Sequence, residues 1–247
     1  MAGKTRIDQL LTERGLAPSR ARAQALVMAG LVFVGGKRID KPGQQVAADA
    51  VPDVRGRDHP WVGRGGVKLA HALEHFALDP TGAVAMDIGS STGGFTQVLL
   101  ENGAAHVFAV DVGTNQLDWK LRQDPRITVL EQTNARDLTP AIITQGCDWV
   151  VCDASFIGLA KVLEAPLALA LPGAQLVALI KPQFEVRREE VGKGGIVRDP
   201  ALHDRVCQEV ADWLGTVGWQ VAGIIPSPIT GSEGNVEFLV SARKNGE

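Results

Sequence analysis

The chain has 247 residues, of which 45% are hydrophobic and 21% are charged, a composition typical of a soluble globular protein of one or two domains. The net charge is −3, but its sign is unevenly distributed. Residues 1–60 carry ten Lys/Arg and six Asp/Glu, and the rest of the chain carries 15 and 22. A basic segment ahead of an acidic body is expected when one part of a protein approaches phosphate groups.

The sequence argues against a secreted, disulfide-bonded or membrane protein. Its three cysteines, Cys147, Cys152 and Cys207, are too few for a disulfide scaffold and have no metal-ligand spacing. The first residues are charged and lack the apolar core of a signal peptide. No stretch approaches the roughly 18 apolar residues of a membrane span. We therefore expect a cytoplasmic protein with no membrane attachment and no metal site.

The first 50 residues predict one small α+β unit. Arg6–Arg14 and Arg20–Ala29 read as helices, with Ser19 as the N-cap of the second. Leu31–Val34 and Arg38–Ile39, joined by two glycines, predict a β-hairpin. The unit also carries seven basic residues that could contact phosphate groups: Arg6, Arg14, Arg20, Arg22, Lys37, Arg38 and Lys41. On charge alone, a solvated surface explains them equally well.

Three motifs in this unit identify a relative. The opening R-x-D-x-x-L, the helix start S-R-A-R-A and the hairpin V-x-V-x-G-K resemble the S4 RNA-binding domain over almost its whole length. The resemblance implies that the second helix and the loop after it grip RNA. We expect an S4-like RNA-binding domain at residues 1–50. A linker follows at Val51–Val62, where two prolines interrupt any sustained period, and a second domain spans residues 63–247.

The second domain predicts an α/β fold. After a helix at Arg64–Phe76, whose first residue we add to the candidate RNA contacts, apolar strand-like runs alternate with helical stretches. The runs are Val84–Ile88, His106–Val112, Ile127–Glu131, Trp149–Asp153, Gln175–Lys181, Val221–Pro226 and Glu237–Ala242. This alternation predicts a mostly parallel seven-stranded sheet covered on both faces, and Val162–Leu171 reads as a core helix. No helix fits between the last two runs, so we expect an antiparallel pair at the edge.

A glycine-rich turn follows the first strand of this domain, in the segment MDIGSSTGGFTQVLLENG at Met86–Gly103. Glycines let a backbone approach a ligand closely, and open α/β sheets bind ligands at the carboxyl ends of their strands. The spacing G-x-x-x-G-G does not match the dinucleotide fingerprint G-x-G-x-x-G. A plain strand-to-helix turn is the alternative interpretation.

The next two strands narrow the choice of ligand. Asp111 lies at the tip of the second strand, where a carboxylate can bind both ribose hydroxyls, and a polar stretch at Thr133–Asp137 suits an adenine edge. A nicotinamide cofactor remains open, because it also places its ribose on such an acidic residue.

The order of these strand-end residues resembles the Rossmann-like S-adenosylmethionine methyltransferases. The resemblance implies that S-adenosylmethionine is the cofactor. It implies these cofactor-binding residues: Asp87, Gly89, Ser90, Ser91, Thr92, Gly93, Gly94, Phe95, Asp111, Val112, Asn134, Ala135 and Asp153.

Four charged residues occur where charge is expensive to bury: Lys68, Asp153, Lys181 and Glu237. Because an unpaired buried charge is costly, we expect them to be paired around one cleft. Taken singly, each could be an ordinary exposed residue at a strand end. Cys152 lies inside an apolar strand, so we interpret it as a small buried residue and not as a nucleophile. His203 is interpreted as a packing residue.

Taken in order, the Lys–Asp–Lys–Glu set resembles the FtsJ-type ribose 2′-O-methyltransferases. The motifs D-A-S-F-I, K-P-Q-F-E and G-G-I-V-R-D-P, together with the S4-like domain, resemble the TlyA family, also called the hemolysin A family, over about residues 5–243. The resemblance implies methylation of cytidine 2′-hydroxyls of ribosomal RNA in ribosomal subunits. The chain departs from the FtsJ pattern at Ser90–Thr92, where many members carry Ala-Pro.

The four charged residues would form the catalytic set. Lys181 is the candidate general base if it is neutral; if it is charged, it orients the hydroxyl and stabilises the developing alkoxide. Asp153 would position Lys181, and Glu237 would orient Lys68 or the ribose.

Two other functions compete with this one. A membrane-active hemolysin would require a membrane-inserting segment, which the sequence does not offer. An RNA-binding assembly factor without catalysis would keep the fold and lose the charged set, yet Lys68, Asp153, Lys181 and Glu237 are all present.

Overall fold

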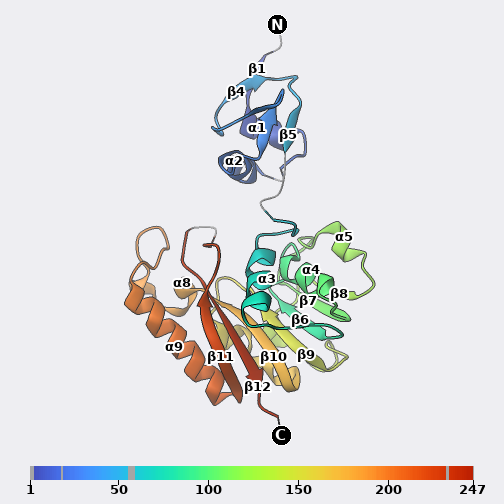
Figure 1. Cartoon of the computed structure of the whole chain (residues 1–247), viewed down its shortest axis with the longest axis vertical. Coiled ribbons are helices and arrows are strands. Elements are labelled where there is room, and N and C mark those ends of the chain that lie inside the picture. Colours follow the sequence, from blue (N-terminus) through green and yellow to red (C-terminus); the bar gives the residue numbers. More distant parts are fainter. Residues whose placement is uncertain (1–2, 18, 55–58, 232–233, 247) are drawn as a thin grey trace. The chain divides into compact units, whose positions relative to one another are not determined.

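The computed structural model describes residues 3–17, 19–54, 59–231 and 234–246, which form two compact units, 1–60 and 61–247 (Figure 1). The first unit holds two helices, α1 (Ile7–Glu13) and α2 (Arg20–Met28). Its five short strands are β1 (Lys4–Arg6), β2 (Val32–Val34), β3 (Lys37–Arg38), β4 (Gln45–Ala47) and β5 (Pro52–Val54). Ser19 caps α2 by accepting a hydrogen bond from the amide of Arg22, so the predicted N-cap is confirmed.

The strands of the first unit form two small antiparallel ladders around one core. Strand β1 pairs with β4, and β2 lies between β3 and β5. Apolar faces of α1 and α2 pack on them through Ile7, Leu11 and Val27, all at most 1% exposed.

The predicted linker is wrong at its start. Residues 52–54 form strand β5, which pairs with β2. Only three residues long and opening on a proline, β5 has no periodicity that a sequence pattern could register. The middle of the expected linker, residues 55–58, lies outside the described residues.

The second unit is a single seven-stranded sheet with helices on both faces. Its strands are β6 (Val84–Ile88), β7 (His106–Val110), β8 (Ile127–Leu130), β9 (Cys147–Cys152), β10 (Ala170–Ile180), β11 (Trp219–Pro226) and β12 (Phe238–Lys244). The helices are α3 (Gly65–His75), α4 (Gly94–Glu101), α5 (Trp119–Arg122), α6 (Leu159–Val162), α7 (Glu164–Leu169), α8 (Pro182–Glu185) and α9 (Pro200–Thr216), with two 3-10 turns, η1 (Ala135–Asp137) and η2 (Arg188–Glu190).

Alternate residues of each strand enter different cores, as the period of a strand requires. In β6, Met86 and Ile88 pack in one core with residues of α6, α7 and α9, whereas Ala85 packs in the other with residues of α3 and α4. The sheet is therefore buried on both sides, and its functional surface must lie at an end of the strands and not on a face.

The strand order is β11-β12-β10-β9-β6-β7-β8, and β6 to β10 run parallel to one another. Strand β12 is antiparallel to both β10 and β11 (Figure 1). The mostly parallel seven-stranded sheet is confirmed, but the antiparallel strand lies one position in from the edge. After β10, helix α9 leads to β11 at the edge of the sheet. Strand β12 then returns to lie between β11 and β10.

The predicted core helix at Val162–Leu171 is shorter than expected. Helix α7 ends at Leu169, and β10 starts at Ala170 with a register shift before Gln175. An apolar run does not distinguish a buried helix from a buried strand, so the change from helix to strand at Ala170 has no signature in the sequence.

Candidate active site

A cavity of about 490 Å³ opens at the carboxyl ends of β6, β9 and β10. The start of α3 and the loop before β12 complete its lining. Open α/β sheets bind their ligands at this end. All four charged residues that the sequence placed around one cleft line this cavity, namely Lys68, Asp153, Lys181 and Glu237.

These four side chains form one continuous chain of ion pairs. Lys68 Nζ lies 2.6 Å from Glu237 Oε2 and 3.7 Å from Asp153 Oδ2. The other oxygen of Asp153, Oδ1, lies 2.7 Å from Lys181 Nζ. Lys68, Lys181 and Glu237 are 7%, 6% and 3% exposed. Charges buried this deeply are tolerated only when paired, so the arrangement explains why two lysines can point into the domain.

Lys181 has two further partners. It follows the last residue of β10, and its Nζ donates to the backbone oxygen of Asp153 at 3.0 Å and to Ser155 Oγ at 2.8 Å. These two hydrogen bonds and the ion pair with the Asp153 carboxylate hold Lys181 Nζ against the loop after β9. Lys181 Nζ is therefore placed as a hydrogen-bond donor at the cavity that it lines.

The glycine turn after β6 forms a wall of this cavity. Gly89 has φ +80°, and a β-carbon there would lie 2.9 Å from the Cα of Ala154 in the loop after β9. A β-carbon at Gly94 would lie 2.8 Å from the backbone nitrogen of Gly66. These close approaches bring the starts of α3 and α4 and the Asp153 loop together around the turn.

A second cavity of about 410 Å³ adjoins the first at the ends of β6, β7 and β8. The two share lining residues, among them Gly89, Ser91 and Asp153. Asp111 Oδ2 accepts from the Ser91 amide at 2.8 Å, and Oδ1 accepts from the Gly113 amide at 2.7 Å. Together the cavities form a long cleft with charge at one end and a mixed polar and apolar lining at the other.

The structure places most of the expected cofactor residues on this cleft. Ser90, Thr92, Gly94 and Phe95 line the first cavity. The second is lined by Asp111, Val112, Asn134 and Ala135.

Asp87 and Gly93 lie behind this lining. Gly93 lies against Leu117 and Leu121, which a β-carbon at this position would overlap. Asp87 is fully buried and accepts a 2.6 Å hydrogen bond from Thr96 Oγ1. Burial, opposed in part by this hydrogen bond, raises the pKa of Asp87 to about 7. We therefore revise the sequence interpretation of these two residues from direct contacts to supports of the turn.

Several lining residues had no assigned role in the sequence analysis. Ser155, Phe156 and Gln183 lie in the motifs D-A-S-F-I and K-P-Q-F-E, which were recognised as motifs only. Phe156 is 89% exposed with φ +66°, and its ring lies tilted against that of Phe184, with the ring centroids 5.2 Å apart. The motifs themselves were the signal that could have identified these residues.

Two loops form the outer rim of the first cavity through Gly195, Thr230 and Gly231. Asn235, 1% exposed, ties them together: its Oδ1 accepts from the Val197 amide at 3.0 Å and its Nδ2 donates to the Gly195 oxygen at 2.9 Å. Gly195 lies in the motif G-G-I-V-R-D-P, which was recognised as a motif only, and no pattern marks the loop with Thr230 and Gly231.

Cys152 and His203 behave as the sequence analysis expected. Burial raises the pKa of the Cys152 thiol to about 12, which keeps it unreactive. His203 packs on Phe238, and its Nε2 lies 2.9 Å from the Val197 oxygen.

The candidate RNA contacts fall in both units. In the first unit, Arg6 and Arg20 contact Asp8, and Arg38 pairs with Asp40 at 2.7 Å. The remaining four of that unit are exposed: Arg14, Arg22, Lys37 and Lys41. In the second unit, Arg64 lines the first cavity and donates to the Thr230 oxygen at 2.8 Å.

Within the described ranges, no helix is both long and apolar enough to cross a membrane. Among the same residues, no three or more His, Cys, Asp or Glu side chains gather in a way that could hold a metal ion.

Comparison with known proteins identifies both units. Residues 61–244 match the model of the FtsJ-like methyltransferase family, and residues 5–51 match the S4 domain. The chain is 48% identical to the 16S/23S rRNA (cytidine-2'-O)-methyltransferase TlyA of Mycobacterium tuberculosis, over 98% of this chain and 91% of that protein.

Two solved structures share the fold of this chain in whole or in part. A Streptococcus thermophilus protein that carries the name hemolysin is 44% identical, with a TM-score of 0.80 over 99% of this chain and 90% of its own. An S-adenosylmethionine dependent methyltransferase from Mesorhizobium loti shares the fold of the second unit at 18% identity, with a TM-score of 0.52 over 74% of this chain and 100% of its own. The chain therefore belongs to the FtsJ-like methyltransferase family and, with its S4 domain, to the group of those enzymes that includes TlyA.

Proposed function

We propose that this protein uses S-adenosylmethionine to methylate the 2′-hydroxyl of cytidine in ribosomal RNA. The observation that carries the proposal is the buried chain Glu237–Lys68–Asp153–Lys181 in the cavity beside the glycine turn. The TlyA relative, named for this reaction on 16S and 23S rRNA, supports the choice of substrate. Such an enzyme works in the cytoplasm, where its ribosomal substrate lies.

The long cleft fits S-adenosylmethionine. Gly89 and Ser91 leave the backbone of the turn open to the cleft, Asp111 offers carboxylate oxygens at its ribose end, and Asn134 and Ala135 line the end suited to adenine. When bound, the cofactor supplies an activated methyl group. We assign the residues of the second cavity to the adenosine part and those around Gly89 and Asp153 to the methionine part.

The chain's own residues would act on the ribose hydroxyl. A 2′-hydroxyl is a weak nucleophile, so it must be oriented, and its proton must be removed as it reacts. Lys181, held by Asp153 and Ser155, can donate a hydrogen bond to the hydroxyl oxygen and stabilise negative charge developing there. We therefore assign Lys181 to orientation of the hydroxyl and to charge stabilisation, and the proton that the hydroxyl loses passes to water in the cleft.

Asp153 and the Lys68–Glu237 pair have supporting roles in this mechanism. Asp153 contacts both lysines, one with each carboxylate oxygen, and therefore fixes the distance between the two cations. Glu237 balances Lys68, which would otherwise be a buried cation beside a second one.

The first unit would bring RNA to this site. Its S4 domain and its basic residues give it the surface expected for phosphate contacts. We propose that Arg6, Arg14, Arg20, Arg22, Lys37, Arg38 and Lys41 bind RNA there, and that Arg64 meets the substrate strand at the cavity.

The test is transfer of tritium from methyl-labelled cofactor to ribosomal RNA. Subunits and free 16S and 23S rRNA are prepared from a bacterial strain that lacks this class of enzyme and incubated with the purified protein. We expect label in at least one RNA, recovered as 2′-O-methylcytidine after digestion. Absence of transfer to every RNA, with RNA binding retained, would instead indicate an RNA-binding factor without catalysis.

A further inference from the structure

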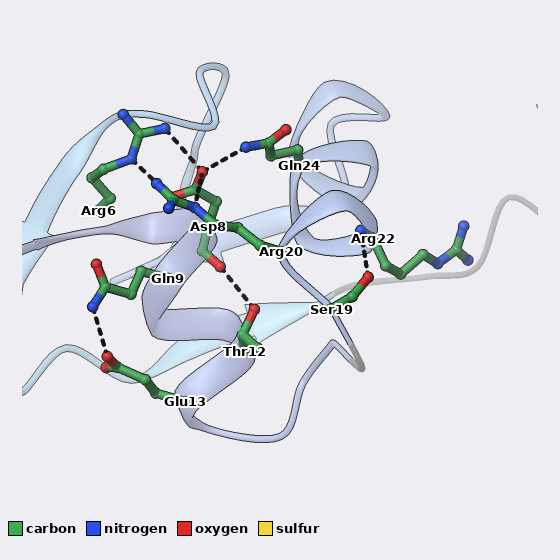
Figure 2. Close-up of polar contacts among 9 residues, drawn as sticks. All are labelled: Arg6, Asp8, Gln9, Thr12, Glu13, Ser19, Arg20, Arg22 and Gln24. Atoms are coloured by element: carbon green, nitrogen blue, oxygen red, sulfur yellow. Dashed lines mark hydrogen bonds and ion pairs between the residues drawn. The ribbon is translucent and has the colours of Figure 1, made fainter. Parts of the chain in front are cut away.

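Asp8 in the first unit is a charged residue that no proposed contact with RNA uses. It lies in the first turn of α1 with a side chain that is 0% exposed. Arg6 donates to both of its carboxylate oxygens, from Nε at 3.0 Å and from NH2 at 2.9 Å (Figure 2). Such a two-point contact fixes the plane of the guanidinium group as well as its position.

A second arginine contacts the same carboxylate from the other helix. Arg20, the first residue of α2, donates from Nε to Asp8 Oδ2 at 3.2 Å, and Gln24, one turn later on α2, donates to the same oxygen at 2.8 Å. Figure 2 shows the side chains of Arg6, Arg20 and Gln24 converging on Asp8, whereas Arg22 points away. Asp8 therefore joins α1 to α2 and holds two guanidinium groups next to each other.

Both arginines remain open to solvent on their outer side. Their side chains are 40% and 55% exposed, although the carboxylate between them is fully buried. Arg20 uses Nε for Asp8, so its two terminal nitrogens are not engaged by that carboxylate. The Arg6 guanidinium lies against Gly43, where a β-carbon would come within 3.1 Å of NH1.

The electrostatics of the cluster suit a positioning role. Two adjacent guanidinium groups repel each other unless an anion lies between them. The buried carboxylate of Asp8 is that anion for Arg6 and Arg20. The Arg6 contact, helped by Gln24 and Arg20, holds the pKa of Asp8 well below its usual range, so the carboxylate stays charged at neutral pH. An RNA phosphate reaching the exposed side would meet two guanidinium groups already in place.

We propose that Asp8 is a positioning residue that holds Arg6 and Arg20 as a preformed pair for RNA phosphates. The proposal rests on the proposed function, in which the first unit binds ribosomal RNA. Arginine side chains have many rotamers, and fixing them before binding removes part of the entropy cost of the complex.

The substitution Asp8→Asn separates this role from simple electrostatics. It adds one unit of positive charge to the unit, which by itself tightens binding to a polyanion. If Asp8 positions the arginines, binding instead weakens, by about tenfold when two side chains are released. The matched control is Asp49→Asn, the same charge change at an exposed carboxylate of the same unit.

The measurement is filter binding of the full-length protein to labelled 16S and 23S rRNA at fixed salt. We expect Asp8→Asn to bind about tenfold more weakly and Asp49→Asn to bind as tightly as wild type or slightly more tightly. Adding Asp8→Asn to an Arg6→Ala/Arg20→Ala variant should cause no further loss, whereas a purely structural role would give an additional one. Cofactor affinity, set by the other unit, should be unchanged.

Equal or tighter RNA binding by a folded Asp8→Asn variant overturns the proposal. If that variant unfolds, Gly43→Ala decides: it crowds the Arg6 guanidinium from an exposed position and should weaken RNA binding about threefold with an unchanged melting temperature. Wild-type affinity in Gly43→Ala would then overturn it. If the wild-type protein binds neither rRNA, the proposed function itself fails, and the role of Asp8 falls with it.

Discussion

At the scale of single residues, the site depends on charges that are buried and mutually satisfied. Lys68 and Glu237 show this most clearly, since both are nearly inaccessible and lie 2.6 Å apart. Removing one partner of such a pair leaves an uncompensated charge, which costs more than removing both. Structure and catalysis can therefore be separated by comparing single and double variants.

We predict that Lys68→Met and Glu237→Gln each lower the free energy of unfolding by about 3 kcal/mol, because each leaves a buried charge unpaired. The double variant should regain much of that stability but no methyl transfer, since Lys68 is also needed beside Asp153. Denaturant unfolding and label transfer are measured on all three proteins. Additive losses of stability would show that the two residues do not act as a pair.

Asp87 gives the unit a pH dependence of known sign. Its pKa, about 7 in the fold, lies above the usual value of 3.8 because the carboxyl is buried. A group with a raised pKa stabilises the fold below its unfolded pKa, and this contribution is lost as the pH rises toward the folded pKa. The relevant window is therefore about pH 4 to 7.

We predict that Asp87→Asn removes this pH dependence. Between pH 5 and pH 8 the wild-type protein should lose on the order of 1–3 kcal/mol of stability relative to the variant. Unfolding curves in urea at several pH values measure the difference. Parallel stability profiles for the two proteins would contradict the raised pKa.

At the scale of elements, local sequence patterns predicted which short segments form helices or strands. Which strands pair over long sequence distances was harder to predict. Strand β6 and the capped helix α2 follow directly from an apolar run and from Ser19. The position of β12 inside the sheet depends on how α9 carries the chain, and the strand β5 depends on a partner twenty residues away. Neither has a signature in its own residues.

The same distinction applies to the site. Asp153, Lys181 and Glu237 lie next to strand ends, and Lys68 lies near the start of α3. These four could be grouped in advance because unpaired buried charges are costly and because their order resembles the FtsJ-type enzymes. The rim consists of loops joined by Asn235, and nothing in a loop sequence states which other loop it meets.

The glycine turn offers a test at this scale. Gly89 and Gly82 both have positive φ, +80° and +76°, but a β-carbon at Gly89 would contact the Ala154 backbone, whereas one at Gly82 meets nothing within 4 Å. Both alanine variants should lose about 1–2 kcal/mol of stability from backbone strain, and Gly89→Ala should lose more because its β-carbon also meets the Ala154 backbone. Only Gly89→Ala should also lose cofactor affinity, by more than tenfold, in calorimetric titration. Equal cofactor affinities would show that the close approach at Gly89 is not needed.

At the scale of the whole molecule, charge is divided between the two units. The chain is acidic overall, yet residues 1–60 carry a net excess of four positive charges, ten against six. RNA binding through such a surface releases counterions, so affinity falls with salt in proportion to the phosphate contacts made. We therefore expect RNA binding to depend on particular lysines and arginines of the first unit and not on the net charge of the chain.

We predict that Lys37→Gln lowers the slope of log affinity against log salt by about 0.7–0.9, the value for one phosphate contact. The control is Lys161→Gln, which removes an equally exposed lysine of the second unit and should leave the slope unchanged. Binding to 23S rRNA is measured across a salt series. If the two variants show the same dependence of RNA affinity on salt, Lys37 does not contact an RNA phosphate.

We propose above that the four buried charged side chains direct methyl transfer to a ribose hydroxyl. The most direct measurement is the chemical position of the transferred methyl group, by mass spectrometry of nucleosides from rRNA treated with wild-type protein or with Lys181→Met, alongside cofactor affinity. We predict 2′-O-methylcytidine with the wild type and, with cofactor binding retained, at least a hundredfold slower formation in the variant, as expected when a transition-state hydrogen bond is lost. A methyl group on the base, or near-normal 2′-O-methylation by Lys181→Met, would contradict it.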